Sequence, residues 1–404
     1  MRNVVFVAPF PLETTMRFAR AAAGLAGVRL LGISQEGATG ADARLFADVV
    51  RVADGLDTRQ LIQAATLLEN RHGKLHRVLG ILEPLQVQLA EVRRALGVPG
   101  TDPGTADLFR DKARMKDELR RHGLPCARHR LVRTWQDAEG FITEVGLPIV
   151  LKPPAGMGCK ATWRIHSIDE LRAALAAIHA SPENPALAEE LVRGREHSFE
   201  TITIGGDVRF QSCSRYYPTP LEVMETPWIQ WVVVLPRVID GPDYADARAL
   251  GVRAVSALGL ETGFTHMEWF RRDDGSLVIG EIAARPPGAH IVVANSYAHD
   301  ADMYRAWARA VIDEAFDGPY ERRYAVAIAF LRGVGRGRVL RISGVERANE
   351  QVGRHVVESR LPTVGAPRSD SYEGDGYVIV RDPDTEVVKA AAKTVIETIQ
   401  IEYG

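Results

Sequence analysis

A chain of 404 residues is too long for one hydrophobic core, so we expect two or three domains. Hydrophobic residues make up 46% and charged residues 25%, and the formal net charge is −2. This balance provides no positive field for nucleic acid or an anionic membrane, and we expect neither as a partner. The three cysteines lack a CxxC spacing, which argues against a zinc site and favours a reducing, cytoplasmic location.

The first hundred residues alternate short apolar runs with helical patterns. The first run ends at Pro9 and is too short for a signal sequence or a membrane span. VVFVAPF, VRLLGIS and RVLGILE predict strands, and the segments between them predict helices. This alternation predicts a parallel sheet with helices on both faces and a binding crevice at the carboxyl ends of its strands. Residues there, such as Glu13, Thr14 and Glu83, can contact a ligand or serve as helix caps and solvated loop residues.

Two Pro- and Gly-containing breaks divide the rest of the chain, at 98–107 and 316–323. A charged helix, RDKARMKDELRRHG, follows the first break and ends near Gly123. Lys112 lies in its first turns and, taken alone, reads as a solvated lysine. An α/β segment follows the second break and ends in an amphipathic helix near 385–398.

The segment GFTHMEWFRRDDGSLVIGEIAARPPG predicts a β-hairpin with a two-residue type I′ turn at Asp274-Gly275. That turn places Glu268 opposite Glu281, with Cβ atoms roughly 4.5–5.5 Å apart. Facing like charges destabilise a sheet unless one is protonated or a cation lies between them. Magnesium held by both carboxylates and nucleotide phosphates meets that need; the alternative is two solvated glutamates on an outer face. Arg285, on the same face as Glu281, can meet an anionic substrate or intermediate.

Lys152 ends the apolar strand in GLPIVLKPPAGMGCKATWRI, where a buried ammonium requires an anion. Gly156 and Gly158 permit positive φ, which suits a flap over phosphates, although such a loop is also a plain hairpin turn. Neither GxxxxGK[ST] nor GxGxxG is present. Further on, the backbone of ALAEELVRGREHSFETITI can read a purine edge, and Glu196 can accept from ribose hydroxyls.

In this order, the motifs resemble the ATP-grasp superfamily: DK at 111–112, VLKP at 150–153, the Gly-rich loop, EELVRGRE at 189–196, and E…E with RPPG at 268–288. The resemblance covers about 100–315. It implies an α/β protein whose catalytic part is α+β, with an ATP-grasp domain at 106–318. Within that domain, the flap spans about 125–190 and the main lobe about 191–318. Residues 1–105 resemble the Rossmann-like domain that commonly precedes this fold, and 319–404 resemble a C-terminal α/β subdomain.

The resemblance assigns roles by position. It implies that the following residues bind ATP: Lys112, Lys152, Gly156, Gly158, Lys160, Glu189, Glu190, Leu191, Val192 and Glu196. Of these, Lys112 and Lys152 contact phosphates, residues 189–192 surround adenine, and Glu196 meets the ribose. Glu268 and Glu281 become ligands of Mg²⁺, with Mn²⁺ as an alternative ion. Arg285, with Lys152, becomes catalytic by steadying an acyl-phosphate.

Two positions depart from the family pattern. Ala283 replaces an asparagine that ligates metal in many members, which puts a second metal in doubt. Lys160 replaces the common small hydroxyl residue in the flap.

The resemblance implies an ATP-dependent carboxylate–amine ligase that works through an acyl-phosphate on a small-molecule carboxylate and an amine. A homodimer is compatible with it. The alternatives are a biotin-carboxylase-like or purine-pathway enzyme, a small-molecule kinase, and an ATP-binding regulatory protein weakened in catalysis, for which Ala283 is the support. Residues 213–231 line an acceptor pocket or pack in the core. His266 and His290 are expected to be structural.

Overall fold

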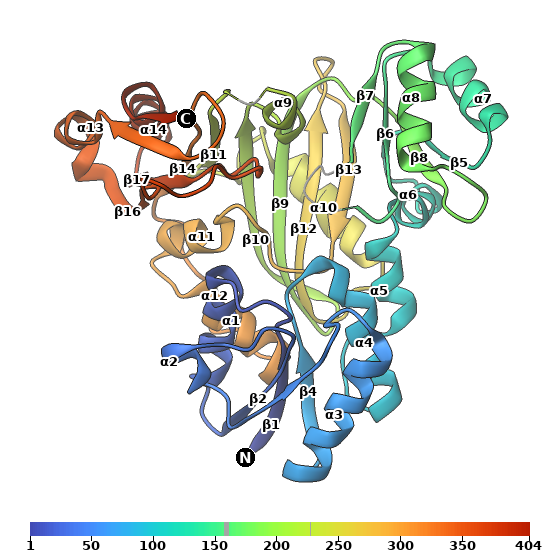
Figure 1. Cartoon of the computed structure of the whole chain (residues 1–404), viewed down its shortest axis with the longest axis vertical. Helices are drawn as coiled ribbons and strands as arrows, with labels where there is room; N and C mark the ends of the chain where they lie inside the picture. The colour runs from blue at the N-terminus through green and yellow to red at the C-terminus, as the bar shows by residue number, and fades with distance from the viewer. Residues whose placement is uncertain (157–160, 227) are drawn as a thin grey trace.

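The computed structural model describes residues 1–156, 161–226 and 228–404. Figure 1 shows a lower α/β lobe coloured blue, a central sheet, a small green lobe at the upper right and an orange-to-red lobe at the upper left. The described helices and parallel and antiparallel sheets confirm the predicted mixed α/β class. Among the described residues, no helix combines the length and apolarity that a membrane crossing requires.

The lower lobe is built on a parallel sheet in the order β3-β2-β1-β4. Its central strand is apolar on both faces, with residues from Val4 to Val7 buried, as a sheet covered by helices requires. Strand β3 was not predicted, because it is short and only half-buried. The elements are β1 (Arg2–Val7), α1 (Glu13–Ala23), β2 (Val28–Ser34), α2 (Gly40–Ala43), β3 (Asp48–Arg51), α3 (Thr58–His72), β4 (Leu75–Leu79), η1 (Glu83–Leu85) and α4 (Gln86–Leu96).

Two capped helices connect this lobe to the rest: α5 (Pro103–Arg110) and α6 (Lys112–Arg121). The predicted linker at 98–107 is wrong beyond Asp102, because Asp102 caps α5 and Pro103 suits its first turn. Asp111 then caps α6, accepting from the backbone N–H groups of the next turn. These caps fix Lys112 as the first residue of α6.

The small lobe carries an antiparallel sheet in the order β5-β8-β6-β7. Apolar faces of two helices pack on it and form a separate core. The elements are β5 (His129–Val132), α7 (Trp135–Val145), β6 (Ile149–Lys152), β7 (Trp163–Ile165), α8 (Ile168–Ile178) and β8 (Ala186–Glu190). Lys152 on β6 and Glu189 on β8 lie on the same face of this sheet, because Lys152 pairs with Leu187 and Glu189 pairs with Val150.

The central sheet is antiparallel, in the order β13-β12-β9-β10-β11-β14-β17-β16. Strand β14, which follows the second sequence break, pairs with β11, so C-terminal strands extend the same sheet. Its strands are β9 (Arg195–Ile204), β10 (Asp207–Tyr217), β11 (Trp231–Leu235), β12 (Gly263–Arg271), β13 (Leu277–Ala283), β14 (Ala325–Leu331), β16 (Val356–Arg360) and β17 (Gly376–Asp382). The other elements are α9 (Pro220–Glu225), α10 (Ala245–Ala257), α11 (Ile291–His299), α12 (Met303–Ala308), η2 (Arg309–Asp313), β15 (Val339–Ser343), α13 (Val345–Val352), η3 (Gly353–His355), α14 (Thr385–Thr398) and β18 (Gln400–Tyr403).

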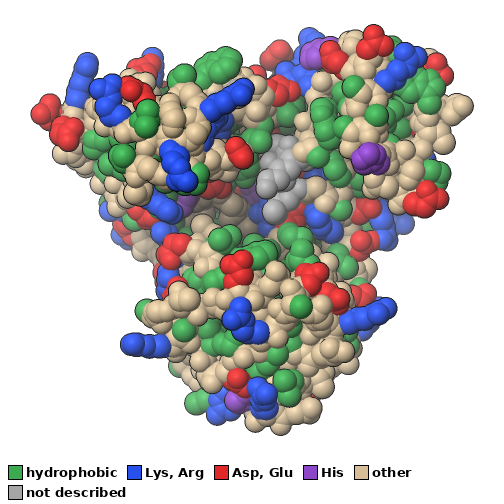
Figure 2. All heavy atoms as spheres, in the orientation of Figure 1, with side chains coloured by type: hydrophobic (Ala, Val, Ile, Leu, Met, Phe, Trp, Pro, Cys, Tyr) green, Lys and Arg blue, Asp and Glu red, His purple; other side chains and the backbone are tan. Residues whose placement is uncertain are grey.

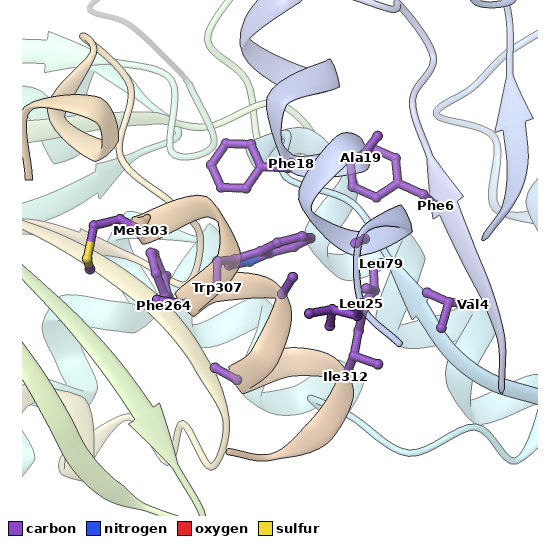
Figure 3. Packing of buried hydrophobic residues seen from close by; sticks show 14 of the residues in the cluster. Val4, Phe6, Phe18, Ala19, Leu25, Leu79, Phe264, Met303, Trp307 and Ile312 are labelled. Atoms are coloured by element: carbon purple, nitrogen blue, oxygen red, sulfur yellow. The ribbon is translucent and has the colours of Figure 1, made fainter. Parts of the chain in front are cut away.

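An apolar core joins the lower lobe to the central part of the chain (Figure 3). Trp307 of α12 projects between two aromatic rings of the lower lobe, with ring centroids 5.0 Å from Phe18 and 6.2 Å from Phe6. The Trp307 ring is almost fully buried. This core holds the carboxyl end of β4 against the central sheet.

Truncating Trp307 to alanine is expected to lower the free energy of unfolding by about 3–5 kcal/mol, because a large cavity would open in this core. Chemical denaturation should compare Trp307→Ala with Trp228→Ala, whose ring is 64% exposed. Each variant loses one indole, so the fluorescence signals are comparable. Equal stability of the two variants would contradict the assignment of Trp307 to a core that joins two lobes.

Candidate functional site

The β12–β13 hairpin does not close as predicted. The backbone N–H of Arg272 donates to the Ser276 carbonyl (2.9 Å), and that of Gly275 donates to the Arg272 carbonyl (3.0 Å). The loop is therefore Asp273, Asp274 and Gly275, and only Gly275 takes a positive φ, +84°. The predicted two-residue type I′ turn is wrong, because a three-residue turn with glycine at its left-handed position closes the hairpin instead.

A β-bulge restores the register that the longer turn displaces. Arg271 faces Leu277 and Trp269 faces Ile279, but Glu268 faces Glu281, which leaves Gly280 as the extra residue. A Cβ at Gly280 would lie 3.1 Å from a ring carbon of Phe270 and 3.2 Å from the Glu268 carbonyl oxygen, so the bulge favours glycine. The pairing of Glu268 with Glu281 is thus as predicted, although the turn is not.

Lysines from two other lobes approach this carboxylate pair. Lys112 Nζ lies 3.3 Å from Glu281 Oε2, and Lys152 Nζ lies 3.9 Å from the same oxygen. Burial alone would raise the pKa of Glu281, but Lys112 and then Lys152 outweigh it and lower that pKa to about 2. Glu281 is therefore ionised at neutral pH and lies next to two ammonium groups.

Glu83, at the carboxyl end of β4, reaches the same region from the lower lobe and is buried. Its Oε2 accepts from Arg285 Nε (3.1 Å) and Nη2 (2.9 Å), and its Oε1 accepts from Arg110 Nη1 (3.0 Å). Burial would lower the pKa of Arg285, but Glu83 outweighs it and raises that pKa. Sequence reasoning named Glu83 only as one of several residues near a crevice and missed this pair, which joins segments far apart in the chain.

The described part of the Gly-rich loop lies against α5 and α6. The Gly156 carbonyl accepts from Lys112 Nζ and from Arg110 Nη1, each at 3.1 Å. Gly158 and Lys160 lie outside the described residues.

In the predicted adenine hinge, the neighbouring side chains of Glu189 and Glu190 have different partners. The Glu189 carboxylate lies between Lys116 (Oε1, 3.2 Å) and Lys152 (Oε2, 2.8 Å). Burial would raise its pKa, but Lys116 and Lys152 lower it to about 2. Glu190 instead accepts from the backbone N–H of Arg128 (3.0 Å) and from its guanidinium (2.9 Å). Sequence reasoning missed Lys116, which no local motif distinguishes from the surface lysines of a charged helix.

These groups surround one cavity of about 580 Å³, at the meeting of the lobes, where Figure 2 shows the molecule hollowed. All predicted site residues that the structure describes line it: Lys112, Lys152, Gly156, Glu189, Glu190, Leu191, Val192, Glu196, Glu268, Glu281 and Arg285. The cavity is also lined by residues outside the predicted nucleotide set: Tyr216, Thr219–Glu222, Trp231, Ala289, Ile291 and Tyr372.

Part of the segment 213–231 thus faces the cavity, whereas Cys213 is buried in the core. The Trp231 ring stacks on Phe330 with centroids 4.7 Å apart, and its Nε1 donates to the Pro218 carbonyl (3.1 Å). Tyr216, Trp231 and Tyr372 thus form an aromatic wall of the cavity that also contains the carboxylate pair.

The donor set of this pair fits a divalent cation. Burial, then Glu268 and then Glu281, raise the pKa of Glu196 well above its ordinary value, so a third carboxyl group lies within the field of the pair. Among the residues that the structure describes, no group of three His, Cys, Asp or Glu side chains forms a metal site. An ion held by Glu268 and Glu281 would therefore complete its shell with phosphate oxygens and water, as Ala283 requires.

His266 lies beside the pair, with Nδ1 3.0 Å from Glu200 Oε1 and Nε2 3.8 Å from Glu268 Oε1. Burial would lower its pKa, but Glu200 and then Glu268 raise it to about 9. His290, in contrast, is 4.0 Å from Glu373, and burial lowers its pKa to about 4.

The metal-free protein is expected to lose stability as the pH rises through about 9. The folded-state pKa of His266 lies above its unfolded value of about 6.5, so its stabilisation is complete below pH 6.5 and lost above 9. Urea denaturation at about pH 6 and pH 9.5 should show a larger decline in the wild type than in His266→Asn. Equal declines would contradict a charged His266 in the folded protein.

Three comparisons relate the chain to known proteins. Residues 117–293 match the family model of the ATP-grasp domain. The L-arginine-specific L-amino acid ligase of Bacillus subtilis is 27% identical over 251 residues, which is 61% of this chain and 60% of that protein. The chain thus spans less than two thirds of the length of this curated relative.

Two solved structures share the whole fold. The L-amino acid ligase from Bacillus licheniformis superposes with a TM-score of 0.82 at 18% identity, covering 100% of this chain and 99% of that one. The biotin carboxylase domain of the Hydrogenobacter thermophilus 2-oxoglutarate carboxylase, in complex with MgADP, has a TM-score of 0.71 at 17% identity and covers 99% and 90%. At these identities, the likeness shows the fold.

Proposed function

We propose, on the premise that residues 117–293 of this chain belong to the ATP-grasp family, that the protein is an ATP-dependent carboxylate–amine ligase. Its substrates are a small-molecule carboxylate, an amino acid or a related acid, and an amine. The amino-acid ligases of Bacillus subtilis and Bacillus licheniformis support this substrate class.

The observation that carries the proposal is the convergence of three lobes on one carboxylate pair. Glu281 meets lysines from α6 and β6, and Arg285 follows on the same hairpin with its guanidinium held by Glu83. Glu268 and Glu281 would hold Mg²⁺ or Mn²⁺, which supplies positive charge between phosphate oxygens. Phosphoryl transfer requires little more from a protein than such positioning and charge.

The reaction has two steps. An oxygen of the substrate carboxylate attacks the γ-phosphorus of ATP, the bond to the β-phosphate oxygen breaks, and ADP leaves. The amine nitrogen then attacks the acyl carbon of the acyl-phosphate, inorganic phosphate leaves with the bonding electrons, and the nitrogen loses a proton to solvent. Lys112 and Lys152 neutralise charge that spreads over the phosphates, and Arg285 meets the carboxylate and acyl-phosphate oxygens.

Arg285 is oriented for this role. Its Nε and Nη2 donate to Glu83, and Nη1 donates to the Pro286 carbonyl at 2.9 Å. Since each Nη carries two hydrogens, one N–H on Nη1 and one on Nη2 are left for a substrate oxygen. The aromatic wall of Tyr216, Trp231 and Tyr372 lines the same cavity as Arg285 and supports an acceptor subsite there.

A phosphate-release screen tests the function. Purified protein with ATP and Mg²⁺ is expected to release phosphate only when a suitable carboxylate and amine are both present, and mass spectrometry is expected to show their condensation product. Phosphate release with no pair from a broad amino-acid panel would contradict the ligase. Turnover that depends on bicarbonate would favour the biotin-carboxylase-like alternative, and a stable phosphorylated product would favour a kinase.

A further inference from the structure

Lys116 is a second lysine of α6, one turn beyond Lys112, and it has no solvent-exposed surface. Its ammonium lies 3.2 Å from Glu189 Oε1 and donates to the carbonyl of Gly280, the extra residue of the bulge. Burial lowers its pKa, and the Glu189 carboxylate opposes that shift. Burying a charged group costs free energy, so such a group needs a specific partner of opposite charge.

That partner is shared. Glu189 Oε2 lies 2.8 Å from Lys152 Nζ, while the same Nζ lies 3.9 Å from Glu281 Oε2. Lys152 is therefore shared between Glu189 on β8 and Glu281 on β13. Lys116 is the second cation on Glu189, and it is not among the residues that line the cavity.

We propose that Lys116 is a positioning residue that, by balancing the charge of Glu189, keeps Lys152 available to the phosphates of the nucleotide. The inference rests on the proposed nucleotide site but not on the ligase chemistry. It assigns the two lysines on Glu189 different tasks. Lys152 contacts the ligand, and Lys116 acts only through Glu189.

Removing Lys116 would leave a buried carboxylate with one cation. Glu189 would then hold Lys152 more strongly, and Lys152 would contribute less to phosphate binding. The hinge backbone would still surround adenine. The loss should therefore appear in the affinity for ATP and not in that for adenosine.

The experiment measures dissociation constants of ATP, with Mg²⁺, and of adenosine by calorimetry in four variants: wild type, Lys116→Met, Glu189→Gln and the double variant. The ratio of the two constants reports phosphate binding alone. Lys116→Met is expected to reduce the preference for ATP by about tenfold, the effect of one weakened hydrogen bond to a charged group. The double variant, which removes both charges, is expected to recover the preference to the level of Glu189→Gln.

Lys389→Met, which removes a surface lysine paired with Glu386, is the matched control and is expected to leave the ratio unchanged. If Lys116 has only a structural role, Lys116→Met lowers the melting temperature without changing the ratio, and the inference is overturned. If Lys116→Met does not fold, the double variant decides: a ratio below that of Glu189→Gln would show that Lys116 does not act through Glu189. A wild type that binds ATP no better than adenosine would overturn the nucleotide site itself, and with it the proposed function.

Discussion

Glu281→Gln is expected to lower magnesium-dependent ATP turnover by about 100-fold or more, since it removes an anion that faces both the metal position and the lysines. Glu268→Gln is expected to have an effect of similar size. The pKa of Glu281 is lowered to about 2, so at neutral pH the amide replaces a full negative charge. Turnover should be measured across a magnesium titration, because a weakened site is expected to shift the required concentration upward.

The two variants should differ in stability. Glu268 has His266 as its charged partner, at 3.8 Å, and faces the like charge of Glu281, so its loss is expected to leave the metal-free melting temperature unchanged or higher. Glu281→Gln removes the ion pairs with Lys112 and Lys152, so this variant is expected to have a lower melting temperature. Asp273→Asn makes the same chemical change at the exposed tip of the hairpin and serves as the control. Full turnover in Glu281→Gln at unchanged magnesium would exclude the carboxylate pair as the metal site.

Arg285→Gln is expected to lower ligase turnover by about 100-fold while changing ATP affinity much less. The guanidinium lines the same cavity as the aromatic wall, and it is anchored by Glu83. In the proposed reaction it contacts the carboxylate and acyl-phosphate oxygens and not adenine. Steady-state turnover and calorimetric ATP binding on the same protein separate the two effects.

Arg209→Gln, at a half-exposed position on β10, is a matched control and should change neither quantity. Glu83→Gln is a companion variant, since it leaves the charge of Arg285 but removes its anchor. Turnover is expected to fall in Glu83→Gln as well. An equal loss of ATP affinity and turnover in Arg285→Gln would show that this arginine binds the nucleotide instead.

The facing glutamates show how far sequence reasoning extends on a hairpin. Alternation of apolar and polar residues placed Glu268 and Glu281 on one face, because successive side chains of a strand point to opposite faces of the sheet. The turn has one residue more than predicted, and the bulge adds one residue to β13. Together the two changes restore the predicted pairing of Glu268 with Glu281. At the bulge, Phe270 packs over Gly280 and a lysine from α6 donates to the Gly280 carbonyl, and a strand pattern contains neither contact.

The partners of the site residues were less predictable than the residues themselves. The order of the motifs predicted Lys112, Lys152 and Arg285 as site residues. Glu83 contacts Arg285 but lies far from it in the sequence, in the lower lobe. Lys116 looks like its solvated neighbours in a charged helix until β8 and β13 enclose it. Such pairs arise only when separate lobes meet, so periodicity and propensity do not encode them.

The pairing of β14 with β11 also bears on how the chain can be divided. The region that matches the ATP-grasp domain ends at residue 293, yet the hydrogen bonds of β11 are completed by a strand that begins at Ala325. A fragment cut between these points would leave a long, apolar sheet edge open to other chains. The matched region therefore does not contain every strand that pairs within the central sheet, and gene fusions or transplanted domains should retain the C-terminal strands.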